Sequence, residues 1–252
     1  MKTLVTRPRA DSLALAETLA ARGIETVIEP LLTIRPEPEA RARIDAALGG
    51  AQALLFTSAN GVRVFAGACA RRDLPVFAVG DATARAAKAA GFAQVESAQG
   101  DAAGLAKLAA ARLKPETGHL LHPAARHVAG DLAGDLGRAG FRVRRAVIYE
   151  SIPAAGLSAD TAALLRRRAV GAALFFSPRT AQSFVRLIGE AGLTENLTNT
   201  AAIALSADVA ALLRHLAWRR IAVAESPTEA SLLAALERCR DAAAKEERRV
   251  HE

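Results

Sequence analysis

The stretch LLFTSANGVRVF, residues 54–65, joins two hydrophobic patterns through a short polar segment. The apolar run at its start is typical of a buried strand, whereas the apolar residues at its end recur at helical spacing. Between them lie Thr57, Ser58 and Asn60, whose side chains can cap a helix or bind a ligand. Such a junction is typical of the ligand-binding edge of a parallel α/β sheet, where helix N-termini favour anions.

Short β-branched or leucine-rich runs alternate along the chain with alanine- and leucine-rich segments of helical period. This alternation is typical of β-α units that build parallel sheets, so the sequence predicts an α/β fold. We expect helices in most of the intervals between the strands. The predicted strands are residues 3–6, 26–29, 53–57, 76–79, 94–96, 119–122, 142–149, 172–176, 201–205 and 220–224.

The chain also contains an internal repeat. The segment around Phe56 and Phe65 resembles the segment around Phe175 and Phe184 at an offset of 119 residues. Three other pairs of segments, in the same order along the chain, have offsets between 117 and 128. We interpret the repeat as four β-α units used twice. The alternative is that alanine- and leucine-rich units resemble one another by composition alone.

The repeat does not fix the domain boundaries. A tandem arrangement would divide the chain near residues 114–118. In a second arrangement, the extended segments 29–38 and 144–153 bridge two lobes, because each ends at a proline that disfavours helix. The pattern alone does not choose between the two arrangements.

The charge and composition limit the partners. A net charge of +7 and an isoelectric point near 10.2 admit an anionic partner. However, the 33 basic residues are interleaved with 26 acidic ones and only 4% of residues are aromatic, so we expect no nucleic-acid binding. No apolar stretch approaches membrane-spanning length and the N-terminus has no signal-peptide pattern, so we expect no membrane association.

The cysteines and histidines show no metal-site or disulfide pattern. Cys69 and Cys239 are far apart and form no C-x-x-C motif, which is typical of reduced thiols in a cytoplasmic protein. His122 and His127 stand five residues apart across a proline-containing turn, which is not the spacing of metal ligands on a helix. We therefore expect a cytoplasmic location and no metal.

Six segments, in this order and spacing, are similar to motifs of the uroporphyrinogen-III synthase family. They are residues 4–36 (LVTRPRADSLALAETLAARGIETVIEPLLTIRP), 54–65, 76–92 (VFAVGDATARAAKAAGF), 147–153 (VIYESIP), 175–184 (FFSPRTAQSF) and 224–237 (AESPTEASLLAALE). The resemblance spans almost the whole chain. Each motif is weak alone, but six in register are specific.

The resemblance implies two similar parallel-sheet α/β lobes joined by a two-stranded β linker, with a cleft between them. The first lobe would combine residues 1–33 with 154–252, and the second would be 37–147. Residues 30–37 and 146–153 would be the linker strands. This favours the bridged arrangement over the tandem one.

The resemblance also implies a lyase that uses no metal and no organic cofactor. The family cyclises hydroxymethylbilane, a linear tetrapyrrole with eight carboxylates, with inversion of ring D and loss of water, to give uroporphyrinogen III. Because the polarised intermediate is a cation, we expect catalysis mainly by holding the substrate in a near-attack shape. We expect a monomer that binds this small molecule. A transient contact with the preceding pathway enzyme is compatible with this expectation.

Polar residues at the carboxyl ends of the predicted strands are the candidate ligands. The expected substrate-binding residues are Arg7, Thr57, Ser58, Asn60, Gly80, Thr83, Ser177, Arg179 and Thr228. The alternative for Ser58, Ser177 and Thr228 is that they only cap helices. The alternative for Arg7 is a solvated loop charge.

Tyr149, the only tyrosine, lies in the second bridging segment and matches a VY motif of the family. A phenol there could donate a proton to the leaving hydroxyl, so Tyr149 is the candidate general acid. The alternative is a structural tyrosine whose hydroxyl is satisfied within the protein.

Two positions depart from the family pattern. Where the family has strand-Arg-Gly, this chain has His122-Pro123, so any role of that arginine passes to Arg126 or lapses. Where the family has G-x-x-T, this chain has Ser206 and Asp208. These departures keep a second function open, namely a non-catalytic two-lobed protein that binds a tetrapyrrole or another anion.

Overall fold

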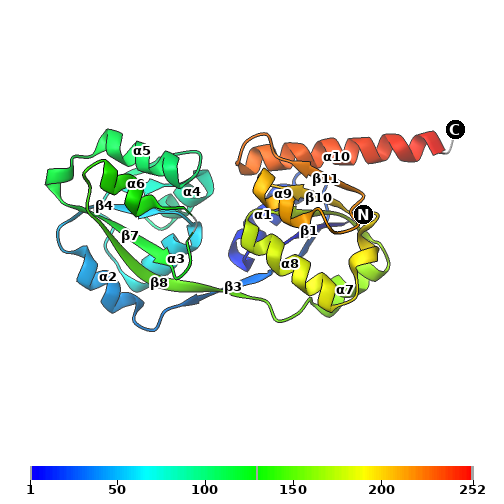
Figure 1. Ribbon diagram of the computed structural model, residues 1–252, viewed down its shortest axis with the longest axis horizontal. Coiled ribbons are helices and arrows are strands. Elements are labelled where there is room, and N and C mark those ends of the chain that lie inside the picture. The colour runs from blue at the N-terminus through cyan, green and yellow to red at the C-terminus, as the bar shows by residue number, and fades with distance from the viewer. Residues whose placement is uncertain (1, 129, 251–252) are drawn as a thin grey trace. The chain divides into compact units, whose positions relative to one another are not determined.

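The computed structural model describes residues 2–128 and 130–250 and divides the chain into two compact units (Figure 1). Unit 1 contains Met1–Thr33 and Ile152–Glu252, and unit 2 contains Ile34–Ser151. Each unit is built around one sheet in which parallel pairs dominate, with helices on both faces. The α/β fold class predicted from the sequence is therefore confirmed.

Unit 2 is an alternating series of helices and strands. Its elements are α2 (Ala40–Leu48), β4 (Ala51–Phe56), α3 (Ala59–Ala68), β5 (Val76–Ala78), α4 (Asp81–Ala89), β6 (Val95–Ser97), α5 (Ala102–Arg112), η1 (Pro115–Thr117), β7 (His119–Ala125), α6 (Leu132–Arg138) and β8 (Val143–Pro153). Together with β3 (Leu32–Pro36), its strands form a six-stranded sheet in the order β3-β8-β7-β4-β5-β6.

Unit 1 is assembled from both ends of the chain. The N-terminal part supplies β1 (Lys2–Val5), α1 (Arg9–Ala20) and β2 (Thr26–Ile28). The C-terminal part supplies α7 (Ala159–Arg166), β9 (Val170–Phe175), α8 (Pro178–Glu190), η2 (Thr194–Leu197), β10 (Ala201–Ala204), α9 (Ala207–Leu213), β11 (Arg220–Val223) and α10 (Glu229–Val250). Its five strands have the order β11-β10-β9-β1-β2.

The two sheet orders explain the sequence repeat. The series β11-β10-β9-β1-β2 in unit 1 corresponds strand by strand to β6-β5-β4-β7-β8 in unit 2. The N-terminal β1-α1-β2 segment therefore takes the place that β7-α6-β8 takes at the end of unit 2. The tandem arrangement with a boundary near residues 114–118 is wrong, because α5 and β7 lie in the same unit.

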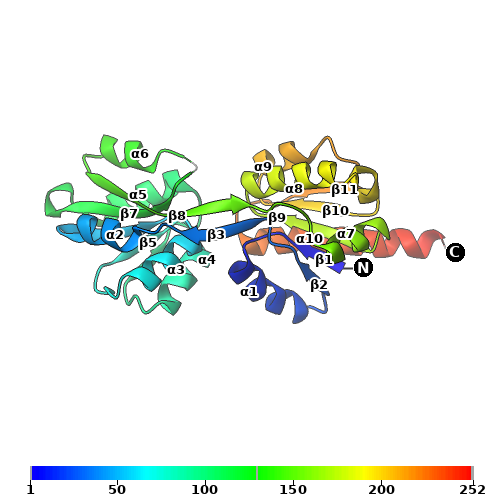
Figure 2. The same cartoon turned by 90° about the horizontal axis from the view of Figure 1, so that it is seen from below.

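Two adjacent strands carry the chain between the units. The boundaries of the units fall inside β3 and inside the eleven-residue β8, and Figure 2 shows these strands running together. The Glu37 N–H donates to the Ile148 carbonyl at 2.9 Å, and the Ala154 N–H donates to the Leu31 carbonyl at 3.0 Å. Residue numbers rise on one strand as they fall on the other, so β3 and β8 are antiparallel. The two-stranded linker of the predicted fold is present.

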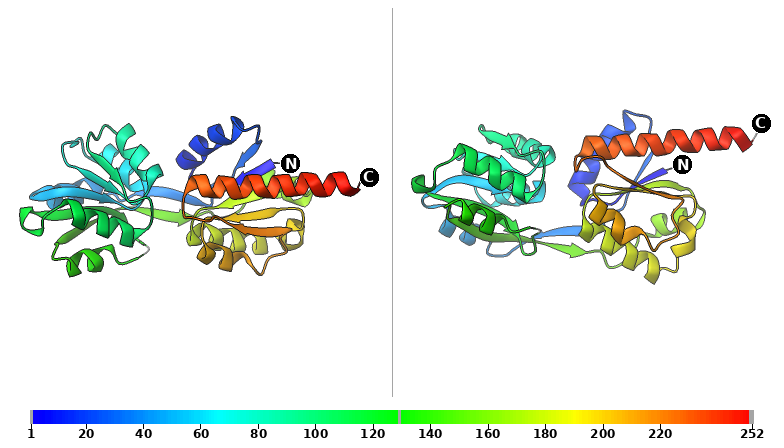
Figure 3. Two further views of the ribbon diagram at one scale, coloured as in Figure 1. Left: turned by 90° about the horizontal axis from the view of Figure 1, so that it is seen from above. Right: turned by 45° about the horizontal axis from the view of Figure 1, so that its top comes forward.

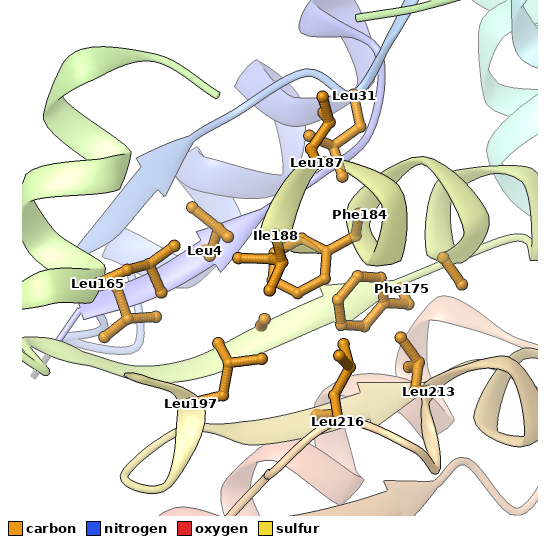
Figure 4. Packing of buried hydrophobic residues seen from close by; sticks show 14 of the residues in the cluster. Leu4, Leu31, Leu165, Phe175, Phe184, Leu187, Ile188, Leu197, Leu213 and Leu216 are labelled. Carbon is orange, nitrogen blue, oxygen red and sulfur yellow. The ribbon is translucent and has the colours of Figure 1, made fainter. Parts of the chain in front are cut away.

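Each sheet is covered by hydrophobic side chains on both faces, as expected for parallel strands. In unit 1, Leu4 and Phe175 belong to the cluster with α7, α8 and α9 (Figure 4), whereas Val5 and Leu174 belong to the cluster with α1 and α10. Figure 3 shows these two sets of helices on opposite faces of the sheet. This alternation places consecutive side chains of one strand in two separate cores.

The two units share an equivalent pair of packed phenylalanine rings. Phe56 and Phe65 in unit 2 make an edge-to-face contact with centroids 5.7 Å apart. Phe175 and Phe184, which the repeat aligns with them, make the same kind of contact at 5.1 Å. The interplanar angles, 76° and 72°, also agree. This common geometry supports duplication over chance similarity of composition.

All ten predicted strands are present, but their ends differ by several residues. The predicted strand at 119–122 continues in β7 to Ala125, through Pro123. A proline has no backbone N–H to donate to a neighbouring strand, so it is disfavoured in a central strand. The paired residues of β7 and β4 end at Leu121, whereas β7 stays paired with β8 as far as Ala125. Pro123 therefore lies where β7 no longer pairs with β4 and pairs only with β8.

A buried carboxylate holds β2 to α7 within unit 1. Glu29 is 4% exposed and accepts hydrogen bonds from the Ser158 N–H at 3.0 Å, the Ser158 hydroxyl at 2.5 Å and the Thr161 hydroxyl at 2.5 Å. Its negative charge lies at the helix N-terminus, where the helix dipole stabilises an anion. Glu29 thus provides the acceptor for three donors of the first turn of α7.

We expect Glu29→Ala to lower the free energy of unfolding by about 3 kcal/mol, because three donors lose their acceptor in a buried position. The matched control is Glu25→Ala, which precedes the same strand and removes only the exposed Lys2–Glu25 ion pair. That change should cost less than about 1 kcal/mol. Urea unfolding of both variants measures the difference, and equal losses would contradict the role given to Glu29.

Candidate functional site

In unit 2, the carboxyl ends of the parallel strands face the N-termini of the helices that follow them. Ser58 caps α3 and accepts a hydrogen bond from the Asn60 N–H at 3.1 Å. Gly80 caps α4 without a side chain, and Asp101 caps α5 by accepting from the Gly104 N–H at 2.9 Å. The edge therefore combines hydroxyl and amide groups with the positive ends of three helix dipoles.

Thr57 lies at the end of β4, half-buried, and its hydroxyl is 3.2 Å from Nε2 of His122 in β7. His122 is 3% exposed. Burial, and secondarily the positive charge of Arg145, lowers the pKa of His122 to about 4. The ring is consequently neutral at physiological pH.

Close packing holds the start of α3 against β7 and β8. A Cβ atom added to Gly61 would lie 3.2 Å from the carbonyl oxygen of Pro123 and 3.6 Å from Cε1 of Tyr149. Glycine at this position is therefore explained by the close approach of the helix. The Tyr149 side chain belongs to the core of unit 2 and is 5% exposed.

Gly80 and Thr83 form the start of α4. The Thr83 N–H donates to the Gly80 carbonyl at 3.0 Å, and the Thr83 side chain is 5% exposed. Gly80 has an extended backbone, and an added Cβ would meet no atom within 4 Å. Beside this turn, the Ser97 hydroxyl donates to Asp81 at 2.7 Å. Neither packing nor backbone conformation accounts for the glycine.

The carboxyl edge of the unit 1 sheet has a similar set of caps. Ser177 accepts from the Thr180 N–H at 3.3 Å, and the hydroxyls of these two residues are 2.8 Å apart. Thr228 accepts from the Ser231 N–H at 3.2 Å. Ser206 accepts from the Val209 N–H at 3.4 Å, so it caps α9 where the family pattern has glycine. All three hydroxyls are therefore helix caps.

Arg7 is not a solvated loop charge, and that alternative is wrong. Its side chain is 15% exposed and pairs with Glu229 at 2.9 Å and with Asp11 at 3.4 Å. Its guanidinium also lies 4.4 Å from the centroid of the Phe176 ring. Arg7 thus joins the end of β1 to α1, α10 and the end of β9 within unit 1.

Three other predicted positions are Arg126, Asn60 and Arg179. Arg126 pairs with Glu37 at 2.6 Å, so this cation is held just beyond the end of the linker strand β3. Asn60 accepts a hydrogen bond from Arg63 at 3.0 Å. Arg179 is half-buried in the first turn of α8.

Three contacts at these edges are not predicted from the sequence. His122 is considered there as a metal ligand and as a departure from the family pattern, but its contact with Thr57 is not expected. The ion pairs of Arg7 with Glu229 and Asp11 are not expected either. His122 is the last residue of the predicted strand 119–122, and a histidine at that position indicates a candidate site residue. No local pattern connects Arg7 with Glu229, which is more than two hundred positions away.

The part of the chain that the structure describes contains no group of three histidine, cysteine or acidic residues able to hold a metal ion. Within the same residues, no helix is both long and apolar enough to cross a bilayer.

Comparison with known proteins identifies similar chains. The family profile described as "Uroporphyrinogen-III synthase HemD" matches residues 14–234. A crystal structure of a mutant uroporphyrinogen III synthase from Thermus thermophilus matches with a TM-score of 0.53 and 20% identity, covering 96% of this chain and 99% of the other. The uroporphyrinogen-III synthetase from Helicobacter pylori matches with a TM-score of 0.60 and 18% identity, covering 93% and 97%. No curated protein sequence matches the chain.

We expect His122 to make the protein less stable in acid. Because its pKa is about 4 in the folded state and about 6.5 when unfolded, the unfolded state binds a proton first as the pH falls. The free energy of unfolding should lose about 3 kcal/mol from this residue between pH 6.5 and pH 4, and little more below that.

The measurement is the difference in unfolding free energy between the unmodified protein and His122→Gln across this pH range. Carboxylates that titrate in both proteins cancel in the difference. A difference that stays constant from pH 7 to pH 4 would contradict the lowered pKa.

Proposed function

The chain belongs to the uroporphyrinogen-III synthase family, and we propose that hydroxyl and amide donors at the carboxyl edges of both sheets bind the carboxylates of its tetrapyrrole substrate. The reaction is the cyclisation of hydroxymethylbilane to uroporphyrinogen III, with inversion of ring D and loss of water. The chain is accordingly a lyase of porphyrin and heme biosynthesis. The observation that carries this function is the family match over residues 14–234.

The chemistry of the reaction sets two demands on the site. The substrate carries eight carboxylates, so the protein needs many donors. The reacting carbon becomes positively charged, so a nearby cationic side chain would oppose the reaction. Neutral hydroxyl and backbone N–H donors meet both demands, because they bind carboxylates without adding a full positive charge.

A capping hydroxyl can also bind substrate. The oxygen of Ser58 uses a lone pair to accept from a helix N–H, which leaves its own proton available for another acceptor. The Thr228 oxygen also accepts from a helix N–H, and its hydroxyl lies 3.2 Å from that of Ser226, so one hydroxyl proton is used between these two residues. A substrate carboxylate offers acceptors only. We therefore assign Ser58, Ser177 and Thr228 to both roles. In the pair formed by Ser177 and Thr180, one hydroxyl proton is already used between the two residues.

Gly80 and Thr83 support the same assignment in unit 2. The open space at Gly80 would let a carboxylate approach the first N–H groups of α4. Thr57 and Asn60 add polar groups at the neighbouring strand end. The Thr57 hydroxyl and the Asn60 amide are uncharged, and the Asn60 amide oxygen already accepts from Arg63 at 3.0 Å.

The two arginines of the proposed set have different surroundings. Arg7 already shares its charge with Asp11 and Glu229, so we propose that it orients the ends of β1, β9 and α10 and contributes only part of its charge to a substrate carboxylate. Arg179 lies in the first turn of α8, where we propose that it binds a carboxylate arm.

Tyr149 is proposed as the general acid that protonates the leaving hydroxyl. Its ring lies against the start of α3, close to the donors of unit 2. We further propose a cytoplasmic monomer that binds no nucleic acid and contacts the preceding pathway enzyme transiently. Two cysteines without a disulfide are compatible with that compartment.

The first experiment couples the purified protein to a source of hydroxymethylbilane and separates the product isomers. We expect uroporphyrinogen III. Uroporphyrinogen I alone, the product of unassisted cyclisation, would refute the activity and leave a non-catalytic binding protein as the remaining function.

A second experiment separates capping from substrate binding at Ser58. Aspartate and asparagine both cap helices well, so Ser58→Asp and Ser58→Asn should unfold at temperatures close to that of the unmodified protein. Aspartate repels a substrate carboxylate, and we expect it to raise KM at least about tenfold. Asparagine keeps a neutral donor and should change KM by less than about threefold. Equal KM values for the two variants would remove Ser58 from the site.

A further inference from the structure

His122 is a buried titratable residue that the proposed reaction does not use. It lies in β7, which is buried along its whole length, and its Nε2 atom is 3.2 Å from the Thr57 hydroxyl. The contact joins the end of β4 to the neighbouring strand. An inference about this contact rests on the proposed function, in which Thr57 binds a substrate carboxylate.

The direction of this hydrogen bond determines what Thr57 can do. A neutral imidazole has one N–H donor and one acceptor nitrogen, and a hydroxyl has a single proton. If Nε2 accepts, the Thr57 proton is used within the protein and the hydroxyl cannot donate to a carboxylate. If Nε2 carries the proton and donates, the Thr57 proton is available to the substrate.

We infer that His122 is a positioning residue whose Nε2–H donates to the Thr57 hydroxyl and thereby directs the Thr57 proton toward a substrate carboxylate. The imidazole is well suited to this role because it cannot easily turn away. It is 3% exposed, and the close approach of Gly61 to the Pro123 carbonyl holds the start of α3 beside the same strand. A fixed donor lowers the entropy that Thr57 loses when substrate binds.

The neutrality of the ring matters for the chemistry as well. A protonated imidazole would also donate to Thr57, but it would add a positive charge beside a site that serves a cationic intermediate. Arg145 extends from β8 to donate to the carbonyls of Ala125 and Arg126, both at 2.7 Å, and its charge disfavours protonation of His122. The donor that orients Thr57 is therefore uncharged.

The test is a double-mutant cycle between His122→Leu and Thr57→Val, measured as KM and kcat for isomer III formation. We expect each single change to raise KM about tenfold, as for the loss of one hydrogen bond to a charged group, with kcat changed by less than about twofold. The double variant should be no worse than either single variant, because both remove the same interaction. His122→Gln, which keeps an N–H donor near Nε2, should restore KM to within about threefold.

His119→Leu is the matched control. His119 is 6% exposed on the same strand, and its Nε2 lies 2.7 Å from the Ala47 carbonyl, at the amino end of β7. Its loss should lower the unfolding temperature and leave KM unchanged. A rise in KM equal to that of His122→Leu would show that the effect comes from general destabilisation and would overturn the inference.

Nitrogen-15 chemical shifts of His122 in the free protein provide a readout that does not depend on activity. We expect the proton on Nε2. A proton on Nδ1, or KM effects that multiply in the double variant, would overturn the inference in an enzyme that still makes isomer III. Absence of isomer III from the unmodified protein would instead refute the proposed function, and the two failures are thus distinguishable.

Discussion

Parallel pairing of the strands is the constraint on which both the fold and the proposed site depend. In a parallel sheet every strand ends at the same edge, and every following helix starts there. In unit 2 the ends of β4, β5 and β6 therefore bring Ser58, Gly80 and Asp101 to one edge as the caps of three helices. The unpaired N–H groups of these helices need acceptors, and the same requirement makes the edge suitable for anions. Capping and the proposed carboxylate binding thus have one geometric cause.

The permuted use of the repeat explains why the chain crosses between units twice. Unit 1 lacks a β-α-β segment at its C-terminal end and takes β1-α1-β2 from the N-terminus instead. The chain must then leave unit 1 along β3 and return along β8. These two crossings are the antiparallel strands β3 and β8, which lie side by side in one sheet and are joined by backbone hydrogen bonds. A linker of two hydrogen-bonded strands is accordingly a consequence of the permutation.

Local patterns were sufficient to predict the fold class and every described strand except β3, and they also offered Ser58, Ser177 and Thr228 as caps, because apolar runs and capping residues act over a few positions. The aligned pair of phenylalanine contacts also follows from the repeat, since equivalent strands and helices place equivalent rings together. The ends of strands were less predictable. β7 passes through Pro123 because its pairing with β4 has already ended at Leu121, which depends on a neighbour and not on the proline itself. Long-range partners were not predictable at all: Arg7 meets Glu229 only because both ends of the chain build one sheet.

The surroundings of the cations support a site that relies on neutral donors. Arg7 is paired with two carboxylates, and Arg126 is paired with Glu37. The charge of each is largely balanced before any substrate binds, so neither presents a full positive charge to a reacting carbon. His122, the buried base nearest to the Thr57 hydroxyl, is kept neutral by the same low-polarity surroundings that hold it in place. If hydroxyl and amide groups hold the carboxylate arms, as we propose, the prior pairing of Arg7 and Arg126 favours a reaction that develops positive charge on its substrate.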